Sequence, residues 1–298
     1  MKRVPAYLKP GDLVLIIATA RKTTPDLIQP AIDILNGWGL KTELGPNIFK
    51  AENQFAGTDA ERGADLQWAI DHKIAKAVLI AGGGYGTIRI IDNVDFKPLQ
   101  KNPKWFVGYS DVTVLHNSLH NLKLVSIHGT MAFQFVKNRE ATLSLKHLLF
   151  GKEVKYQIPT HPLNREGKAE GEIVGGNLSI LYAVSGSADD ISTKGKILFI
   201  EDLDEYLYHI DRMMLQLKRS GKLKSLKGLI VGGMTEMKDN KVPFGKTAEE
   251  IIFDAVKEYK FPVCFNLPAG HVANNTALYF GKKAKLSVTK NKVGLSYC

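Results

Sequence analysis

Cysteine is scarce in this sequence, because Cys264 and Cys298 are the only two in 298 residues. Cys298 is the last residue and is poorly placed for a structural bridge, and the pair lacks the spacing of metal-ligating cysteines. The sequence therefore predicts neither a disulfide framework nor a metal site. Such cysteine usage is typical of a reducing compartment, or of a fold that is indifferent to redox conditions.

Long hydrophobic runs are also missing. No apolar stretch approaches the ~18 residues that a transmembrane helix requires. The apolar segment at residues 13–20 follows a basic start and so imitates a signal peptide, but Lys9, Pro10 and Asp12 interrupt the path to it. We therefore predict a buried strand at this segment, no membrane partner and a cytoplasmic location.

A block of basic residues interleaved with aromatics is absent as well. Lys and Arg number 40 against 30 Asp and Glu, and the formal net charge is +10, but the lysines are scattered. Nucleic acid is therefore not an expected partner, whereas an acidic small substrate suits the charge. The hydrophobic content of 44% indicates a folded globular protein, and the length suggests about two domains.

The glycine-rich motifs of nucleotide-binding proteins are not matched. Residues 82–86 do not fit the dinucleotide fingerprint, and Gly245-Lys246-Thr247 lacks the leading glycine of a P-loop, because Asn240 stands there. We therefore expect no cofactor. The turn at residues 82–86 is either a tight connection or a source of backbone N–H donors for an oxyanion or carboxylate.

Apolar runs and amphipathic segments alternate along the first half of the chain. The apolar runs predict buried strands of a mostly parallel sheet, and apolar residues three and four apart predict helices. Thr58 and Glu61 occupy the positions of a capping box at the start of one helix. The expected strands cover residues 13–17, 42–44, 77–81 and 105–107, and the expected helices cover 26–38, 58–71 and 112–122, with another beginning at 87–91.

The second half alternates in the same way after a stretch of different character. Residues 136–170 contain charges and prolines and predict an inter-domain connection, with a helix over residues 141–150. We expect an N-terminal α/β nucleophile domain over residues 1–135, with helices flanking its sheet, and a C-terminal β-rich α/β domain over residues 171–298. The latter should contain helices over 178–184, 208–217 and 248–259 and strands over 196–200, 228–231, 263–267, 277–280 and 284–289.

Ser110 lies where an apolar strand pattern changes to a helical one. Such a sharp turn exposes a serine hydroxyl, and the helix N-terminus that follows stabilises negative charge. The residues by themselves also allow Ser110 to be an ordinary N-cap.

Glu201 and His271 likewise follow apolar strands, and strand ends are where sites form in open α/β sheets. A serine nucleophile needs a base, usually histidine, which a carboxylate orients. The alternatives are that Glu201 belongs to a solvated loop and that His271 is a turn residue. His116 and His120 are four residues apart on a predicted helix, but without the glutamate of a zinc motif they are expected to be packing or surface residues.

Ordered motifs along nearly the whole chain resemble those of the murein LD-carboxypeptidases. These are cytoplasmic serine peptidases that remove the terminal D-alanine from tetrapeptide muropeptides. The matching segments are Leu8–Asp12, Phe55–Asp59 with Glu61-Arg62 and Asp65-Leu66, Gly83–Gly86 with Arg89, Gly108–Asp111 with Thr113, His128-Gly129 with Met131, Gly175–Leu178, Glu201-Asp202 with Glu205, Arg212-Met213 and Leu215–Leu217, and Gly270-His271.

The resemblance implies a role for each site residue. Ser110 would be the nucleophile, His271 the general base and then acid, and Glu201 the residue that orients the imidazole. The oxyanion hole would use the backbone N–H of Asp111 and one from Gly83 or Gly84. Tyr85 and Tyr109 are the expected substrate-binding residues, the substrate is a small peptide, a homodimer is expected, and no metal or cofactor is implied.

Some positions depart from the family pattern, which affects the expected substrate but not the triad. Gly82 stands where an arginine often precedes the glycine-rich turn, Thr130 replaces a frequent proline, and residues 18–21 read Ala-Thr-Ala-Arg in place of an Ala-Pro-Ser segment. Two alternatives stay open: a microcin C-type self-immunity peptidase that cleaves peptidyl- or aminoacyl-nucleotide amides, and a non-catalytic muropeptide-binding protein.

Overall fold

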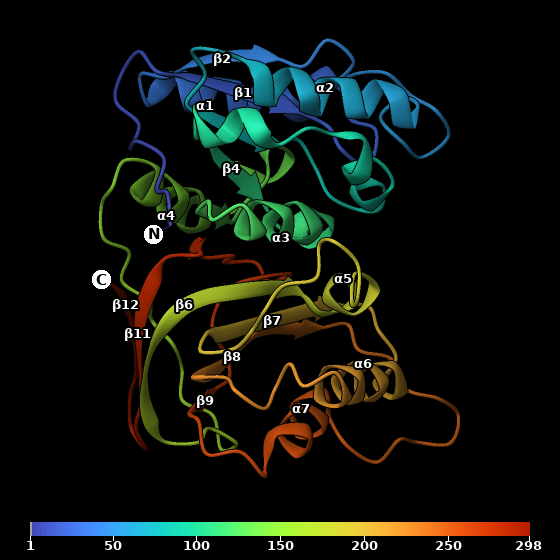
Figure 1. Ribbon diagram of the computed structural model, residues 1–298, viewed down its shortest axis with the longest axis vertical. Coiled ribbons are helices and arrows are strands. Elements are labelled where there is room, and N and C mark those ends of the chain that lie inside the picture. Colours follow the sequence, from blue (N-terminus) through green and yellow to red (C-terminus); the bar gives the residue numbers. More distant parts are fainter. Residues whose placement is uncertain (1) are drawn as a thin grey trace. The chain divides into compact units, whose positions relative to one another are not determined.

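The computed structural model describes residues 2–298, which divide into two compact units (Figure 1). Unit 1 runs to Val154 and includes Thr276–Tyr279, and unit 2 comprises Lys155–Asn275 and Phe280–Cys298. This division differs from the boundaries that we expected. The helix that we placed in the connection belongs to unit 1, because its apolar residues, such as Leu145 and Leu148, are buried there.

Unit 1 is built on a six-stranded sheet with the order β10-β5-β4-β3-β1-β2. The neighbours β2/β1, β1/β3, β3/β4 and β4/β5 pair in parallel, as continuous apolar runs such as Leu13–Ile17 predict. The strands are β1 (Leu13–Ile17), β2 (Lys41–Leu44), β3 (Ala77–Ile80), β4 (Trp105–Gly108), β5 (Ser126–His128) and β10 (Leu278–Phe280). β5 was not predicted, since three residues are too few to show a pattern.

Four α-helices accompany this sheet: α1 (Pro25–Gly37), α2 (Asp59–Asp71), α3 (Thr113–Asn121) and α4 (Arg139–Leu149). The predicted capping box at the start of α2 is present, because Thr58 Oγ1 accepts from Glu61 N and the Glu61 carboxylate accepts from Thr58 N. Such a pair satisfies two backbone N–H groups that a helix start would leave unpaired.

The helix expected from residue 87 onwards does not form. Two short 3₁₀ turns, Thr87–Arg89 and Ile91–Asn93, take its place. Thr87 is fully buried and its N–H donates to Asp111 Oδ2 at 2.8 Å, so a tertiary contact uses the backbone group that begins the segment. Local periodicity was therefore a poor guide here.

Unit 2 contains a second six-stranded sheet, with the order β12-β11-β6-β7-β8-β9. Strands β6 to β9 pair in parallel, and β11 pairs antiparallel with both β6 and β12. The strands are β6 (Gly167–Asn177), β7 (Ile197–Leu203), β8 (Gly228–Thr235), β9 (Val263–Cys264), β11 (Lys283–Val288) and β12 (Val293–Tyr297). Both units are thus α/β structures with mostly parallel sheets.

Helices α6 (Leu207–Arg219) and α7 (Ala248–Val256) lie side by side in unit 2, and α5 (Leu178–Ala183) follows β6 directly (Figure 1). Their apolar faces form a core with the sheet, to which α6 contributes Ile210, Met213 and Leu217 and α7 contributes Ile251 and Ile252. Full burial of each such side chain stabilises the fold by about 1.5–3 kcal/mol.

Strand β7 extends further than predicted. Glu201 and Asp202 are its fifth and sixth residues, rather than loop residues beyond its end, and both are buried. The alternative of a solvated loop is therefore wrong. Across residues 2–298, no helix has the length and apolar character needed to span a bilayer.

Candidate functional site

Ser110 occupies a sharp turn between β4 and α3. Its φ of 64° lies in the left-handed region, where a residue other than glycine costs about 1–2 kcal/mol. The turn is also tight, since a Cβ at Gly108 would lie 2.8 Å from Val112 Cγ2. The N-cap of α3 is Val112, and Tyr109 precedes the 3₁₀ turn Ser110–Val112. Ser110 is therefore not an ordinary N-cap, and strained turns of this kind hold the nucleophile in several hydrolases.

The predicted glycine-rich turn lies beside Ser110. A Cβ at Gly83 would be 3.4 Å from Ser110 Cβ and 3.6 Å from Ser110 Oγ, so the absence of a side chain lets the backbone approach the hydroxyl. On the next residue, a Cβ at Gly84 would be 2.5 Å from side-chain atoms of Arg21. The backbone N–H of Arg21 donates to Gly83 O at 3.4 Å.

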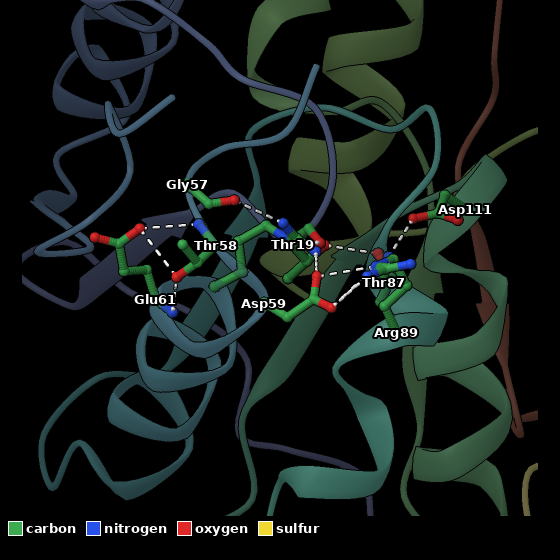
Figure 2. Close-up of polar contacts among 9 residues, drawn as sticks. Thr19, Gly57, Thr58, Asp59, Glu61, Thr87, Arg89 and Asp111 are labelled. Atoms are coloured by element: carbon green, nitrogen blue, oxygen red, sulfur yellow. Dashed lines mark hydrogen bonds and ion pairs between the residues drawn. The ribbon is translucent and has the colours of Figure 1, made fainter. Parts of the chain in front are cut away.

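Polar contacts of Arg62 form a network that holds the loop that follows β1. The arginine's partners Thr19, Gly57 and Asp59 are labelled in Figure 2. Arg62 is 1% exposed; its Nε donates to Thr19 O at 3.1 Å, one terminal nitrogen donates to Gly57 O at 2.8 Å, and the other pairs with Asp59. We assigned no role to Arg62, since an arginine on a helix resembles a solvated residue in sequence. Its partners are mostly backbone carbonyls, which every residue has, so the amino-acid sequence does not indicate which ones Arg62 contacts.

The network continues from Thr19 to the residue after Ser110. The Thr19 and Thr87 hydroxyls are 2.8 Å apart, and the Thr87 N–H donates to Asp111 Oδ2 (Figure 2). Burial raises the pKa of Asp111, and hydrogen bonds from Thr87 partly oppose the shift. The Asp111 side chain thus ties the Ser110 turn to the segment after the glycine-rich turn.

Arg62→Lys should lower the free energy of unfolding by about 2–3 kcal/mol. The single ammonium of lysine cannot replace a guanidinium whose nitrogens donate to both the Thr19 and the Gly57 carbonyls. The matched control is Arg89→Lys, in which an exposed guanidinium pairs with the same Asp59, so that the loss of stability should be clearly smaller. Urea unfolding measures both losses. Equal losses would contradict the assigned role of Arg62.

Unit 2 brings Glu201 and His271 together. His271 Nδ1 lies 2.6 Å from Glu201 Oε2, and the His271 backbone N–H donates to the same oxygen at 3.1 Å. The Glu201 side chain is fully buried and that of His271 is 14% exposed. Since a carboxylate only accepts, Nδ1 carries the proton and Nε2 is the nitrogen that can accept another.

The pair also raises the pKa of His271. Burial by itself lowers this pKa, but the hydrogen bond to Glu201 and the charges of neighbouring carboxylates outweigh burial, and the result lies above the ordinary 6.5. One of those carboxylates is Asp202, whose pKa is raised to about 6 by burial and by the charge of Glu201. His271 is therefore a stronger base than a free imidazole.

Gly270 makes room for the pair. Its φ is +98°, and a Cβ there would lie 2.5 Å from Glu201 Oε2 and 2.6 Å from Glu201 Cγ. The side-chain oxygen of buried Asn275 accepts from Gly270 N at 2.8 Å and holds this backbone in place. We assigned no role to Asn275, because its partner is a backbone N–H.

Gly270→Ala should push Glu201 away from His271. For the reaction proposed below we expect kcat/KM to fall at least about 100-fold, because a displacement of about 1 Å is sufficient for such a loss. The control is Gly186→Ala, which has a φ of +82° but no atom within 4 Å of the added carbon. It should lose about 1 kcal/mol of stability and keep its activity. Steady-state kinetics with thermal unfolding separate the two effects.

The remaining predicted residues have diverse surroundings. Tyr85 is 45% exposed, whereas Tyr109 is buried and its hydroxyl accepts from Gln134 Nε2 at 2.7 Å.

The two histidines of α3 are held by packing and by hydrogen bonds. His116 is buried, and its ring nitrogens lie 2.9 Å from Ser126 Oγ and 2.9 Å from Gly108 O, so it packs beneath the Ser110 turn. His120 Nδ1 lies 2.8 Å from Lys2 Nζ. Among residues 2–298, no cluster of three His, Cys, Asp or Glu side chains is placed to hold a metal.

Comparisons with known proteins cover most of the chain. A model of the LD-carboxypeptidase N-terminal domain matches residues 14–129, and one of the C-terminal domain matches residues 170–286. The chain is 37% identical to the probable murein peptide carboxypeptidase of Bacillus subtilis, over 96% of this chain and 92% of that protein.

Two solved structures are also similar. The muramoyltetrapeptide carboxypeptidase from Oxalobacter formigenes has a TM-score of 0.85 at 30% identity, over 96% of this chain and 98% of that one. The microcin C7 self-immunity protein MccF shares the fold, with a TM-score of 0.85 at 19% identity over 100% and 98% of the two chains.

Proposed function

Because the chain belongs to the LD-carboxypeptidase family and is a peptide-bond hydrolase, we propose that it releases the terminal D-alanine from peptidoglycan tetrapeptides by cleaving the L,D amide bond. The observation that carries this proposal is the buried hydrogen bond of 2.6 Å between His271 and Glu201, supported by the strained turn at Ser110. The names of the relatives from B. subtilis and O. formigenes support the choice of murein peptides as substrate. We assign the reaction to murein recycling.

In the proposed mechanism, His271 Nε2 takes the proton from Ser110 Oγ as the oxygen attacks the scissile carbonyl. Glu201 keeps the proton on Nδ1 and stabilises the imidazolium that forms. The imidazolium then protonates the leaving D-alanine nitrogen. Water, activated by the same imidazole, hydrolyses the acyl-enzyme and restores the serine.

The oxyanion of each tetrahedral intermediate needs backbone donors. We assign this role to the N–H of Asp111, which follows the nucleophile, and to one N–H of Gly83 or Gly84. The approach of Gly83 to within 3.6 Å of Ser110 Oγ, measured from its ideal Cβ position, supports the second donor. Loss of one such donor typically costs about 10²–10³ in kcat.

Of the two expected substrate-binding residues, we assign direct contact with the peptide to Tyr85, whose ring is exposed. Tyr109 is buried, so its proposed role is to support the Ser110 turn from below. Unit 1 would be the domain that carries the nucleophile, and unit 2 the domain that carries Glu201 and His271. The proposed reaction uses only water as co-substrate; a homodimer and a cytoplasmic location remain predictions.

The test is mass spectrometry of L-Ala-γ-D-Glu-diaminopimelate-D-Ala incubated with the protein. The expected result is loss of one alanine residue, with no loss from the epimer that ends in L-alanine. Cleavage of an aminoacyl sulfamoyl adenylate, with the tetrapeptide left intact, would overturn the proposal in favour of a nucleotide-amide peptidase.

A further inference from the structure

The side chain of Arg21 lies on the glycine-rich turn next to Ser110. Its Cγ, Cδ and Nε are each 2.5 Å from the place a Cβ would take on Gly84, so the arginine uses space that only glycine leaves open. The side chain is exposed to solvent.

The guanidinium of Arg21 has no ion pair or hydrogen bond with another residue in the described range 2–298. The two other arginines near this loop differ, because Arg62 and Arg89 both pair with Asp59. A guanidinium presents its donors as a planar fork that matches both oxygens of a carboxylate. Arg21 is therefore available to a carboxylate ligand.

The backbone that carries Arg21 is held firmly although its side chain is exposed. The Thr19 carbonyl accepts from buried Arg62 at 3.1 Å, and the Ala20 carbonyl accepts from Ala56 N at 3.0 Å. The network in Figure 2 therefore fixes the backbone just before Arg21, from which the side chain extends. Binding a ligand would order only the side chain, which reduces the entropy that recognition costs.

Ser110 and Arg21 lie against consecutive residues of the glycine-rich turn, and this spacing matches that of the two substrate groups that a carboxypeptidase must bind. Ser110 Oγ faces Gly83 and Arg21 covers Gly84, and consecutive Cα atoms are about 3.8 Å apart. In a substrate that loses one terminal residue, the scissile carbonyl and the terminal carboxylate are also separated by one residue. A peptide whose carbonyl reaches Ser110, and which runs along the turn from Gly83 toward Gly84, would place its carboxylate near Arg21.

We propose that Arg21 binds the terminal carboxylate of the substrate and restricts cleavage to the last peptide bond. This inference rests on the proposed function and deepens it. Arg21 takes no part in proton transfer, so its removal should act mainly through KM. It should also act only on substrates that carry the carboxylate.

The experiment compares two substrates, the tetrapeptide that ends in D-alanine and the same peptide that ends in D-alaninamide. The wild-type chain should prefer the free acid. Arg21→Gln should lower kcat/KM for the acid by about 10–100-fold, the range expected for a charge-assisted hydrogen bond, and should leave the value for the amide within about twofold. Arg21→Lys should recover part of the preference.

Lys22→Gln is the matched control, because it removes the same charge from the adjacent exposed residue. It should leave both substrates unaffected. Equal losses on acid and amide in Arg21→Gln, or no loss on either, would overturn the role of Arg21. A wild-type chain that cleaves neither peptide would instead refute the proposed function, and this inference with it.

Discussion

Ser110→Ala is expected to lower kcat/KM for the tetrapeptide by at least about 10⁴-fold, because no other group in the proposed mechanism can form the acyl-enzyme. The fold should persist, since alanine has the same backbone strain as serine at a φ of 64°. Steady-state release of D-alanine and thermal unfolding measure the two quantities.

The control for this substitution is Ser118→Ala. Ser118 is buried on α3, and its hydroxyl donates to Val114 O at 3.0 Å within the helix. Activity should stay within about twofold. A second variant, Ser110→Gly, should be inactive but about 1 kcal/mol more stable than Ser110→Ala, because glycine adopts positive φ without strain. Undiminished turnover in Ser110→Ala would exclude the serine mechanism.

Glu201→Gln is expected to lower kcat/KM by about 10²–10⁴-fold. The amide can donate to His271 Nδ1, which places the imidazole proton on Nε2 and blocks acceptance of the Ser110 proton. The pH profile should change as well. The neutral imidazole is the active base, so activity rises as pH passes through the pKa of His271, which in the wild-type chain lies above 6.5.

Without the carboxylate, burial still lowers the pKa of His271 but the strongest opposing interaction is gone. The acidic limb of kcat/KM should therefore move to lower pH. The matched control is Glu43→Gln, which removes a carboxylate 3.6 Å from His72 on the surface of unit 1. The acidic limb of kcat/KM in Glu43→Gln should stay at the wild-type pH. An unchanged limb in Glu201→Gln would show that Glu201 does not set the pKa of the base.

The same pair predicts how stability depends on pH. The folded-state pKa of His271 is raised, so the stabilisation from the charged pair is fully present below the unfolded-state pKa of about 6.5 and is lost as pH rises through the folded value. The stability deficit of Glu201→Gln relative to wild type should thus be larger at pH 6 than at pH 9.

Local patterns were sufficient to predict most elements of both sheets. Continuous apolar runs identified β1 and β3, and the capping box located the start of α2. β6 was missed, because Gly, Lys and Glu in Gly167–Asn177 have low strand propensity. Its first half alternates in burial beside antiparallel β11, and its second half is buried beside parallel β7, so no single period describes it.

The candidate site shows the same limit. The positions of three residues beyond apolar strands, together with the family resemblance, suggested Ser110, Glu201 and His271. Contacts between distant segments determine three other features of the site. These are the positive φ of Ser110, the buried guanidinium of Arg62 and the packing of Arg21 on Gly84. Such contacts have no periodic signature, so only the folded chain reveals them.

The most direct test of the account is to treat the wild-type chain with a fluorophosphonate and map the adduct by mass spectrometry. We predict a single adduct on Ser110, which His271→Ala abolishes because the hydroxyl then lacks its base. Inactivation by the reagent with the label on another residue, and Ser110 unmodified, would contradict the assignment of Ser110 as the nucleophile.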